Sequence, residues 1–165
     1  MPVRLMGETP MLLSEIFMHI ETQFSIFLVN KPGVLANVIG ALAKARINIV
    51  ALTLTDYSEQ GVLRVVCENS AQARAVLGKA HDRWTETDVL VMELSNEPGA
   101  FAAVAQNLAD EHVNILYAYC TGGARGGQTT AVFKLVDPKK AMKVLSAGKE
   151  QKKAGANVKA PPTRR

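Results

Sequence analysis

The stretch Asn30-Lys31-Pro32-Gly33-Val34-Leu35-Ala36-Asn37-Val38 returns at a later point of the chain as Asn96-Glu97-Pro98-Gly99-Ala100-Phe101-Ala102-Ala103-Val104. The offset between the two copies is 66 positions, and residues 30–49 share nine identities in twenty with residues 96–115. Agreement of this kind at one fixed offset indicates an internal duplication. We therefore expect the chain to consist of two copies of one unit of about 66 residues.

Both copies predict the same order of elements. In the first, an apolar strand at Phe24–Val29 precedes the Pro-Gly turn, and the helix that follows has apolar residues at helical spacing. Two strands rich in β-branched residues, a helix near 71–77 and a short fourth strand complete the order β-α-β-β-α-β, which is the ferredoxin-like arrangement. The second copy has only a weak candidate for its last strand, at 156–160. Packed edge to edge, the copies predict an α+β fold with an antiparallel sheet of about eight strands and helices on one face.

The predicted organisation has four parts. Residues 1–21 form an N-terminal extension, 22–88 the first unit, 89–148 the second unit and 149–165 a basic tail. The extension either forms a helix or lengthens the first strand, and its sequence leaves both possibilities open. No apolar run has the length of a membrane span. The two cysteines show neither a disulfide nor a zinc pattern, so we expect a cytoplasmic protein.

The basic excess of the chain is concentrated in the tail. The whole chain carries a net charge of +4, but residues 149–165 hold six basic side chains and one acid, so the remainder carries −1. With few large apolar groups, the tail is expected to be disordered. Nucleic-acid binding through this tail is an alternative function. It is not expected, because no aromatic side chain lies among these charges to stack on a base.

The repeated turn is the candidate binding element. Gly33 and Gly99 lack a Cβ atom, so the backbone can turn sharply there and a ligand can approach it closely. The N–H groups of the helix that follows favour an anion such as a carboxylate. The amides of Asn30 and Asn96 both donate and accept hydrogen bonds, which suits a free amino acid. A simple strand-to-helix turn is the alternative, and turn mechanics alone do not decide between them.

The remaining motifs indicate no catalytic chemistry. The glycine-rich segment at 122–127 lacks the Lys-Ser/Thr and helix of a phosphate-binding loop and is predicted to be a hairpin turn. His19, His81 and His112 lie far apart without ligand spacing. We therefore expect no enzyme activity, no metal ion and no cofactor.

The two turns also carry a family resemblance. The run Asn-Lys-Pro-Gly-Val-Leu-Ala with Ile-Asn-Ile at 47–49, and the second copy with Val-Asn-Ile at 113–115, resemble ACT domains, in particular the stand-alone tandem ACT proteins of bacteria. The resemblance covers about residues 23–145. It implies a homodimeric regulatory protein that binds a free amino acid or similar metabolite between paired units and controls a partner enzyme or regulator. The alternative within regulation is a subunit acting in trans on a biosynthetic enzyme, like the small subunit of acetolactate synthase.

The resemblance also implies two ligand sites, each formed by one turn and the second strand of the other unit. The first would consist of Asn30, Pro32, Gly33, Val34 and Leu35, facing Asn114 and Ile115. The second would consist of Asn96, Pro98, Gly99, Ala100 and Phe101, facing Asn48 and Ile49. Since Val34-Leu35 and Ala100-Phe101 differ in bulk, we expect the two sites to be non-equivalent.

Overall fold

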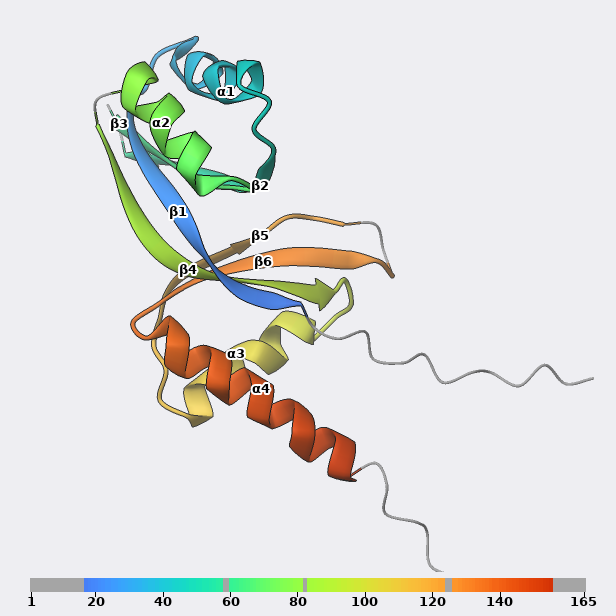
Figure 1. The fold of residues 1–165 in the computed structure, drawn as a ribbon. Coiled ribbons are helices and arrows are strands. Elements are labelled where there is room, and N and C mark those ends of the chain that lie inside the picture. The colour runs from blue at the N-terminus through green and yellow to red at the C-terminus, as the bar shows by residue number, and fades with distance from the viewer. Residues whose placement is uncertain (1–16, 58–59, 82, 124–125, 156–165) are drawn as a thin grey trace, which may run out of the picture.

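The two repeats share one sheet in the computed structural model, which describes residues 17–57, 60–81, 83–123 and 126–155. Its elements are β1 (Met18–Val29), α1 (Val34–Lys44), β2 (Ile49–Tyr57), β3 (Gln60–Cys67), α2 (Ser70–Ala80), β4 (Trp84–Ser95), α3 (Ala100–Asp110), β5 (Ile115–Cys120), β6 (Gln128–Leu135) and α4 (Pro138–Gly155). The sheet is antiparallel with the strand order β2-β3-β1-β4-β6-β5 (Figure 1). The predicted α+β fold with two ferredoxin-like units is confirmed, but the described sheet has six strands rather than about eight.

The difference arises because two long strands each serve both units. β1 and β4 are twelve residues long and pair with each other from Met18↔Met92 to Ile26↔Trp84. The second half of β1 also pairs with β3, and the second half of β4 also pairs with β6. The first half of β1 is thus the fourth strand of the second unit, and the first half of β4 is the fourth strand of the first unit. The weak strand predicted at 156–160 lies outside the described residues.

Both pairs of helices cover the same face of the sheet. Alternate residues of β1 (Phe24, Ile26 and Leu28) are buried against α1 and α2, as the period of two of a strand requires. Leu90, Met92 and Leu94 of β4 are buried in the same way against α3 and α4. The register Ile20↔Leu90 points both rows to one side, because directly paired residues share a face. The predicted placement of the helices on one face is confirmed.

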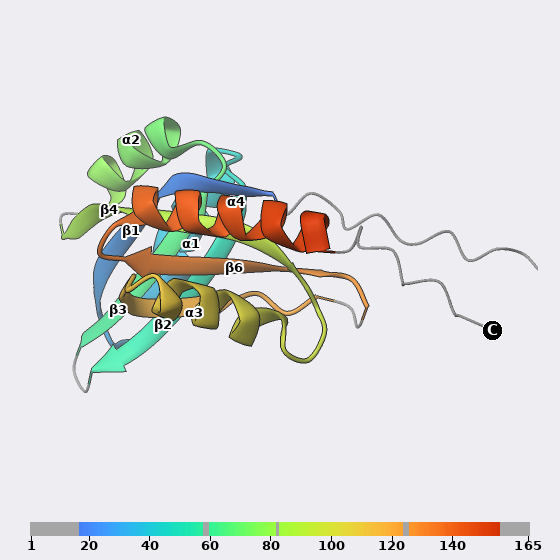
Figure 2. The same ribbon diagram turned by 90° about the horizontal axis from the view of Figure 1, so that it is seen from below.

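The helix-free face is curled onto itself. Figure 1 shows α1 and α2 on one outer side of the curled sheet and α3 and α4 on the other, and Figure 2 shows α3 and α4 side by side along β6. β2 contacts β6 across the concave side although three strands separate them in the sheet. A small third core lies there, made of Ala51, Val66, Val89, Val91 and Val132. Accumulated strand twist brings the outer strands around in this way.

Helix ends differ from the sequence expectations at two places. Asn69 caps α2 by accepting a hydrogen bond from the Gln72 N–H at 2.9 Å, and α2 continues beyond the predicted 71–77 to Ala80. Asp137 caps α4 by accepting a hydrogen bond from the Lys140 N–H at 2.9 Å. That helix runs on to Gly155, so the tail expected to be disordered from residue 149 begins as helix. Its Ala, Lys, Gln and Glu residues are strong helix formers.

The N-terminal extension joins the sheet. β1 begins at Met18, which packs against the second core, so residues 18–21 lengthen the first strand. Of the two interpretations of this segment, the strand is confirmed for these four residues. In the part of the chain that the structure describes, no helix combines the length and apolarity needed to cross a membrane.

Candidate functional site: the repeated Asn-x-Pro-Gly turns

Each repeated turn joins a strand to a helix through a glycine in the left-handed region. The φ angle is +87° at Gly33 and +90° at Gly99, a conformation that costs an L-residue roughly 1–2 kcal/mol. A Cβ atom placed on either glycine would meet nothing within 4 Å. Backbone conformation rather than crowding therefore requires glycine here, and the space above both turns is open.

The helices that follow these turns begin without a side-chain cap. The N-cap residues of α1 and α3 are the two glycines, whereas Asn69 caps α2 and Asp137 caps α4. The first N–H groups of a helix have no partner within it and carry a partial positive charge. The two turns therefore present helix N-termini that favour a carboxylate.

A hollow of about 240 Å³ lies at the first turn. Its lining residues come from the end of β1, the turn, α1, β2 and the start of β3: Leu28, Val29, Asn30, Lys31, Leu35, Leu54, Thr55 and Gly61. Of the residues expected from the sequence, Asn30 and Leu35 line the hollow, while Pro32, Gly33 and Val34 form the turn and the start of the helix beside it. Sequence reasoning missed Lys31, Leu54 and Thr55. The sequence predicts only that alternate residues of β2 share one face of the sheet. It does not predict that β2 lies at the edge of the sheet, next to the first turn.

The second turn is held by the glycine-rich loop. The Asn96 side-chain amide donates to the Gly123 carbonyl at 2.8 Å, and the Asn96 backbone N–H donates to the Gly127 carbonyl at 2.9 Å. This loop connects β5 to β6, as the predicted hairpin requires, and its residues 124–125 lie outside the described part. Phe101 stacks on Phe133 with ring centroids 5.1 Å apart. Pro98, Gly99 and Ala100 complete the turn and the start of α3.

The second-strand residues assigned to the sites pack in the core of their own unit or form hydrogen bonds within it. Val34, Leu35 and Ile49 pack against the first core, whereas Ala100 and Ile115 pack against the second. The side chain of Asn48 donates to Glu68 Oε1 at 2.7 Å, and the Asn114 carbonyl accepts from the Val136 N–H.

The expected pairing of each turn with a second strand stays a prediction. The units join through β1 and β4, which leaves β2 and β5 at the two outer edges. A second copy of the chain, placed on an outer edge, would bring a second strand next to a turn of another unit.

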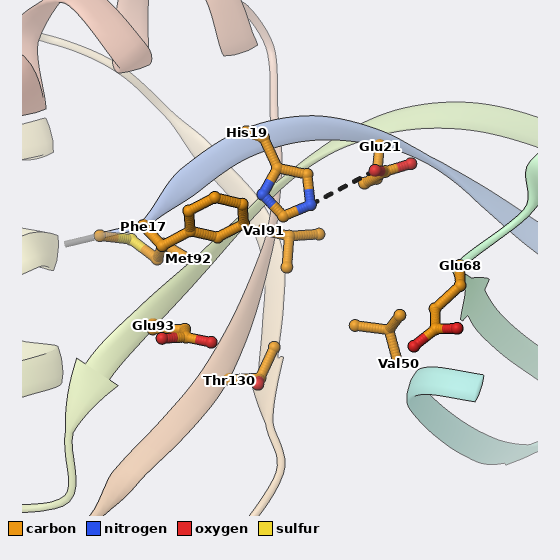
Figure 3. Close-up of a pocket in the computed structure, with 9 residues that line it drawn as sticks. All are labelled: Phe17, His19, Glu21, Val50, Glu68, Val91, Met92, Glu93 and Thr130. Atoms are coloured by element: carbon orange, nitrogen blue, oxygen red, sulfur yellow. Dashed lines mark ion pairs between the residues drawn. The ribbon is translucent and has the colours of Figure 1, made fainter. Parts of the chain in front are cut away.

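A second hollow, of about 260 Å³, opens on the helix-free face between the two halves of the sheet. It is lined by Phe17, His19, Glu21, Val50, Glu68, Val91, Met92, Glu93 and Thr130. Figure 3 shows Glu68 and Val50 on one side of it and Glu93 and Thr130 on the other. His19 Nε2 lies 3.3 Å from Glu21 Oε1. Three carboxylates disfavour an anionic ligand here. Among the described residues, no three His, Cys, Asp or Glu side chains gather closely enough to hold a metal ion.

A buried polar cluster closes the other part of the concave face. Gln23 is fully buried, its amide donates to the Tyr117 hydroxyl at 2.6 Å, and its carbonyl accepts from the Tyr119 hydroxyl at 3.0 Å. The Arg64 guanidinium stacks over the Tyr117 ring at 4.5 Å. Burial raises the pKa of Tyr119, with a further increase from the nearby Tyr117. The cluster ties β1 and β3 of the first unit to β5 of the second.

The match to a known family spans nearly the whole described chain. A family model described as an ACT domain pair matches residues 18–159. The chain belongs to the ACT domain pair family. A protein of Bacteroides thetaiotaomicron of known structure shares 32% identity with this ACT pair, covers 80% of the chain and 90% of its own, and superposes with a TM-score of 0.74.

Two further ACT-pair neighbours share the fold at lower identity. The regulatory subunit of aspartate kinase from Thermus thermophilus, in its ligand-free form, has 14% identity and a TM-score of 0.62 over 80% of this chain and 93% of its own. The corresponding subunit from Thermus flavus has 16% identity and a TM-score of 0.54 over 80% and 95%. No curated protein matches the chain at a significant level.

Proposed function

We propose that this ACT pair is a non-catalytic regulatory protein that binds a free amino acid, or a metabolite of similar chemistry, at a repeated Asn-x-Pro-Gly turn. The observation that carries the proposal is the hollow at the first turn, where a left-handed glycine and a helix start without a side-chain cap adjoin a cavity. The helix N-terminus favours the α-carboxylate, and the side chain and carbonyl of Asn30 suit the polar head of the ligand.

The proposal includes a homodimer formed through the edge strands. Leu52 and Leu54 of β2 are 38% and 48% exposed, and Leu116 of β5 is 55% exposed. Unpaired edges with apolar side chains are surfaces on which a second strand adds readily. A second copy on β2 would also cover the hollow at the first turn, since Leu54 and Thr55 belong to both.

Regulation would follow from differential binding. A ligand that contacts the turn and the edge strand together stabilises the arrangement in which both are correctly placed, and so shifts the population toward it. We propose that an enzyme or a regulator reads this shift, which membership of the ACT domain pair family supports.

The test is a thermal-shift screen of the full chain against the twenty amino acids, each at millimolar concentration. A ligand that binds the folded state alone, at a concentration of 100 times its Kd, stabilises it by about 2.7 kcal/mol, which is readily visible as a higher Tm. A Gly33→Val variant, which places a branched side chain over the turn, should lose the response while retaining its far-UV circular dichroism. If neither the twenty amino acids nor metabolites of similar chemistry, screened in the same way, raise the Tm, the proposal is wrong.

A further inference from the structure

The duplication allows the two turns to be compared position by position, and they carry opposite charges. Lys31 in the first turn corresponds to Glu97 in the second at the offset of 66. Both side chains are exposed, and neither forms an ion pair with any residue that the structure describes. A ligand carboxylate at the first turn therefore meets a free ammonium group, whereas at the second turn it meets a carboxylate.

The side chains that surround the two turns also differ in chemical type. Of the residues that line the first hollow, Val29, Leu35 and Leu54 correspond to Ser95, Phe101 and Cys120 in the second copy. With Leu28, which corresponds to Leu94, the first turn has four aliphatic side chains around its hollow. At the second turn, the ring of Phe101 is stacked on Phe133, and the Asn96 amide is bonded to the glycine-rich loop.

From these differences, and resting on the function proposed above, we infer that only the first turn of each chain binds the ligand, and that the ligand is a carboxylate with an aliphatic side chain. Lys31 and the start of α1 attract the carboxylate. Leu28, Leu35 and Leu54 receive the side chain, and no acidic residue lines this hollow to pair with a cationic one. The volume of the hollow, about 240 Å³, lies below the roughly 300–1,000 Å³ of typical small-molecule sites.

The second turn has a structural role in this assignment. Its asparagine anchors the β5–β6 loop through the side-chain bond to Gly123 and the backbone bond to Gly127. Glu97 repels a carboxylate from the start of α3. The opposite charges of Lys31 and Glu97 therefore leave the chain with one ligand site instead of two.

The test is isothermal titration calorimetry of the full chain with L-leucine, L-isoleucine and L-valine. L-Lysine, L-glutamate and leucinamide, which lacks the carboxylate, serve as comparison ligands. We expect one aliphatic amino acid bound per chain, and affinities at least about tenfold weaker for the three comparison ligands. Lys31→Glu should weaken binding by about tenfold or more, because an attraction becomes a repulsion. The matched charge reversal Glu97→Lys should leave the first-turn affinity within about twofold, and circular dichroism should show both variants folded.

The outcomes separate the two proposals. If no amino acid binds, the proposed function itself is wrong. If amino acids bind with two equivalents per chain, with a preference for lysine or glutamate, or equally well as the amide, the function stands and this inference is wrong. Binding that weakens in Glu97→Lys and not in Lys31→Glu would place the ligand at the second turn and would also overturn it.

Discussion

Replacing Gln23 by methionine tests whether the polar cluster on the concave face holds the two halves of the sheet together. Methionine has a similar length and no hydrogen-bonding amide, so Gln23→Met removes both side-chain bonds at little change in volume. The Tyr117 and Tyr119 hydroxyls then lose the partner that they share across 2.6 Å and 3.0 Å. We expect the free energy of unfolding to fall.

The magnitude follows from the groups left behind. A buried polar group that loses its partner costs roughly 1–3 kcal/mol. Both tyrosines are only half-buried, so water reaches part of each side chain and the lower half of that range applies. Two hydroxyls then give a loss of about 2–4 kcal/mol, a large fraction of the roughly 5–15 kcal/mol that stabilises a typical domain. Urea denaturation followed by circular dichroism measures it as a lower midpoint at unchanged m-value.

A control removes the hydroxyls as well. In the variant that combines Gln23→Met with Tyr117→Phe and Tyr119→Phe, no polar group of the cluster remains unpaired, and stability should recover above that of Gln23→Met alone. The reasoning fails if Gln23→Met lies within about 0.5 kcal/mol of the wild type. It also fails if the triple variant is less stable than the single one.

Three further predictions concern the turns, the thiols and a surface ion pair. Gly33→Ala should lower the free energy of unfolding by about 1–2 kcal/mol, because the φ angle of Gly33 is +87°. Gly40→Ala should raise the free energy of unfolding by up to about 1 kcal/mol, because Gly40 lies inside helix α1 with open space around it. Two changes of the same sign in urea denaturation would contradict this prediction. The exposed Cys120 should react rapidly with a thiol reagent, whereas burial excludes the reagent from Cys67 and raises its pKa to about 11, so Cys67 should react only on unfolding; equal rates in native protein would be the contrary result. Arg74 of α2 donates hydrogen bonds of 2.5 and 2.6 Å to the Glu86 carboxylate, and these bonds lower the pKa of Glu86. The ionised Glu86 therefore contributes to stability at neutral pH, and this contribution is lost as the pH falls through the lowered pKa. Glu86→Gln should therefore destabilise the protein slightly at neutral pH and not in acid, and a pH-independent difference in urea midpoints would refute the assignment.

The local structure could be predicted from the sequence because its determinants are local. The alternation of Phe24, Ile26 and Leu28 and the helical spacing of Val38 and Leu42 each identify one buried face, and all five side chains are buried. The sharing of strands could not be predicted. β1 and β4 each belong to both units because each pairs with strands of both. Pairing between residues as distant in the sequence as Met18 and Met92 leaves no periodic pattern in either segment from which it could be predicted.

In the candidate site, too, the residues near the motif could be predicted from the sequence, and those brought in by strand pairing could not. Asn30 and Leu35 lie in or directly after the repeated motif, and both line the first hollow as the motif suggested. Leu54 and Thr55 reach it from β2 only because β2 pairs with β3 and β3 with β1. Ile115 was assigned to the first site only by the family resemblance, and in the structure it packs against the second core.

This junction also limits how a ligand can act. β1 and β4 pair over nine residues, and the Gln23 cluster adds contacts between the halves across the concave face, so the two units cannot reorient without breaking both. A hinge between units is therefore a poor route for a signal within the chain. The first hollow, in contrast, is bordered by β2, whose outer edge has no strand beside it in the described sheet. A ligand that fixes Leu54 and Thr55 changes the surface that β2 offers to a second copy or a partner. Regulation by this protein should consequently appear as a ligand-dependent change in association at β2, with the internal geometry of each chain unchanged.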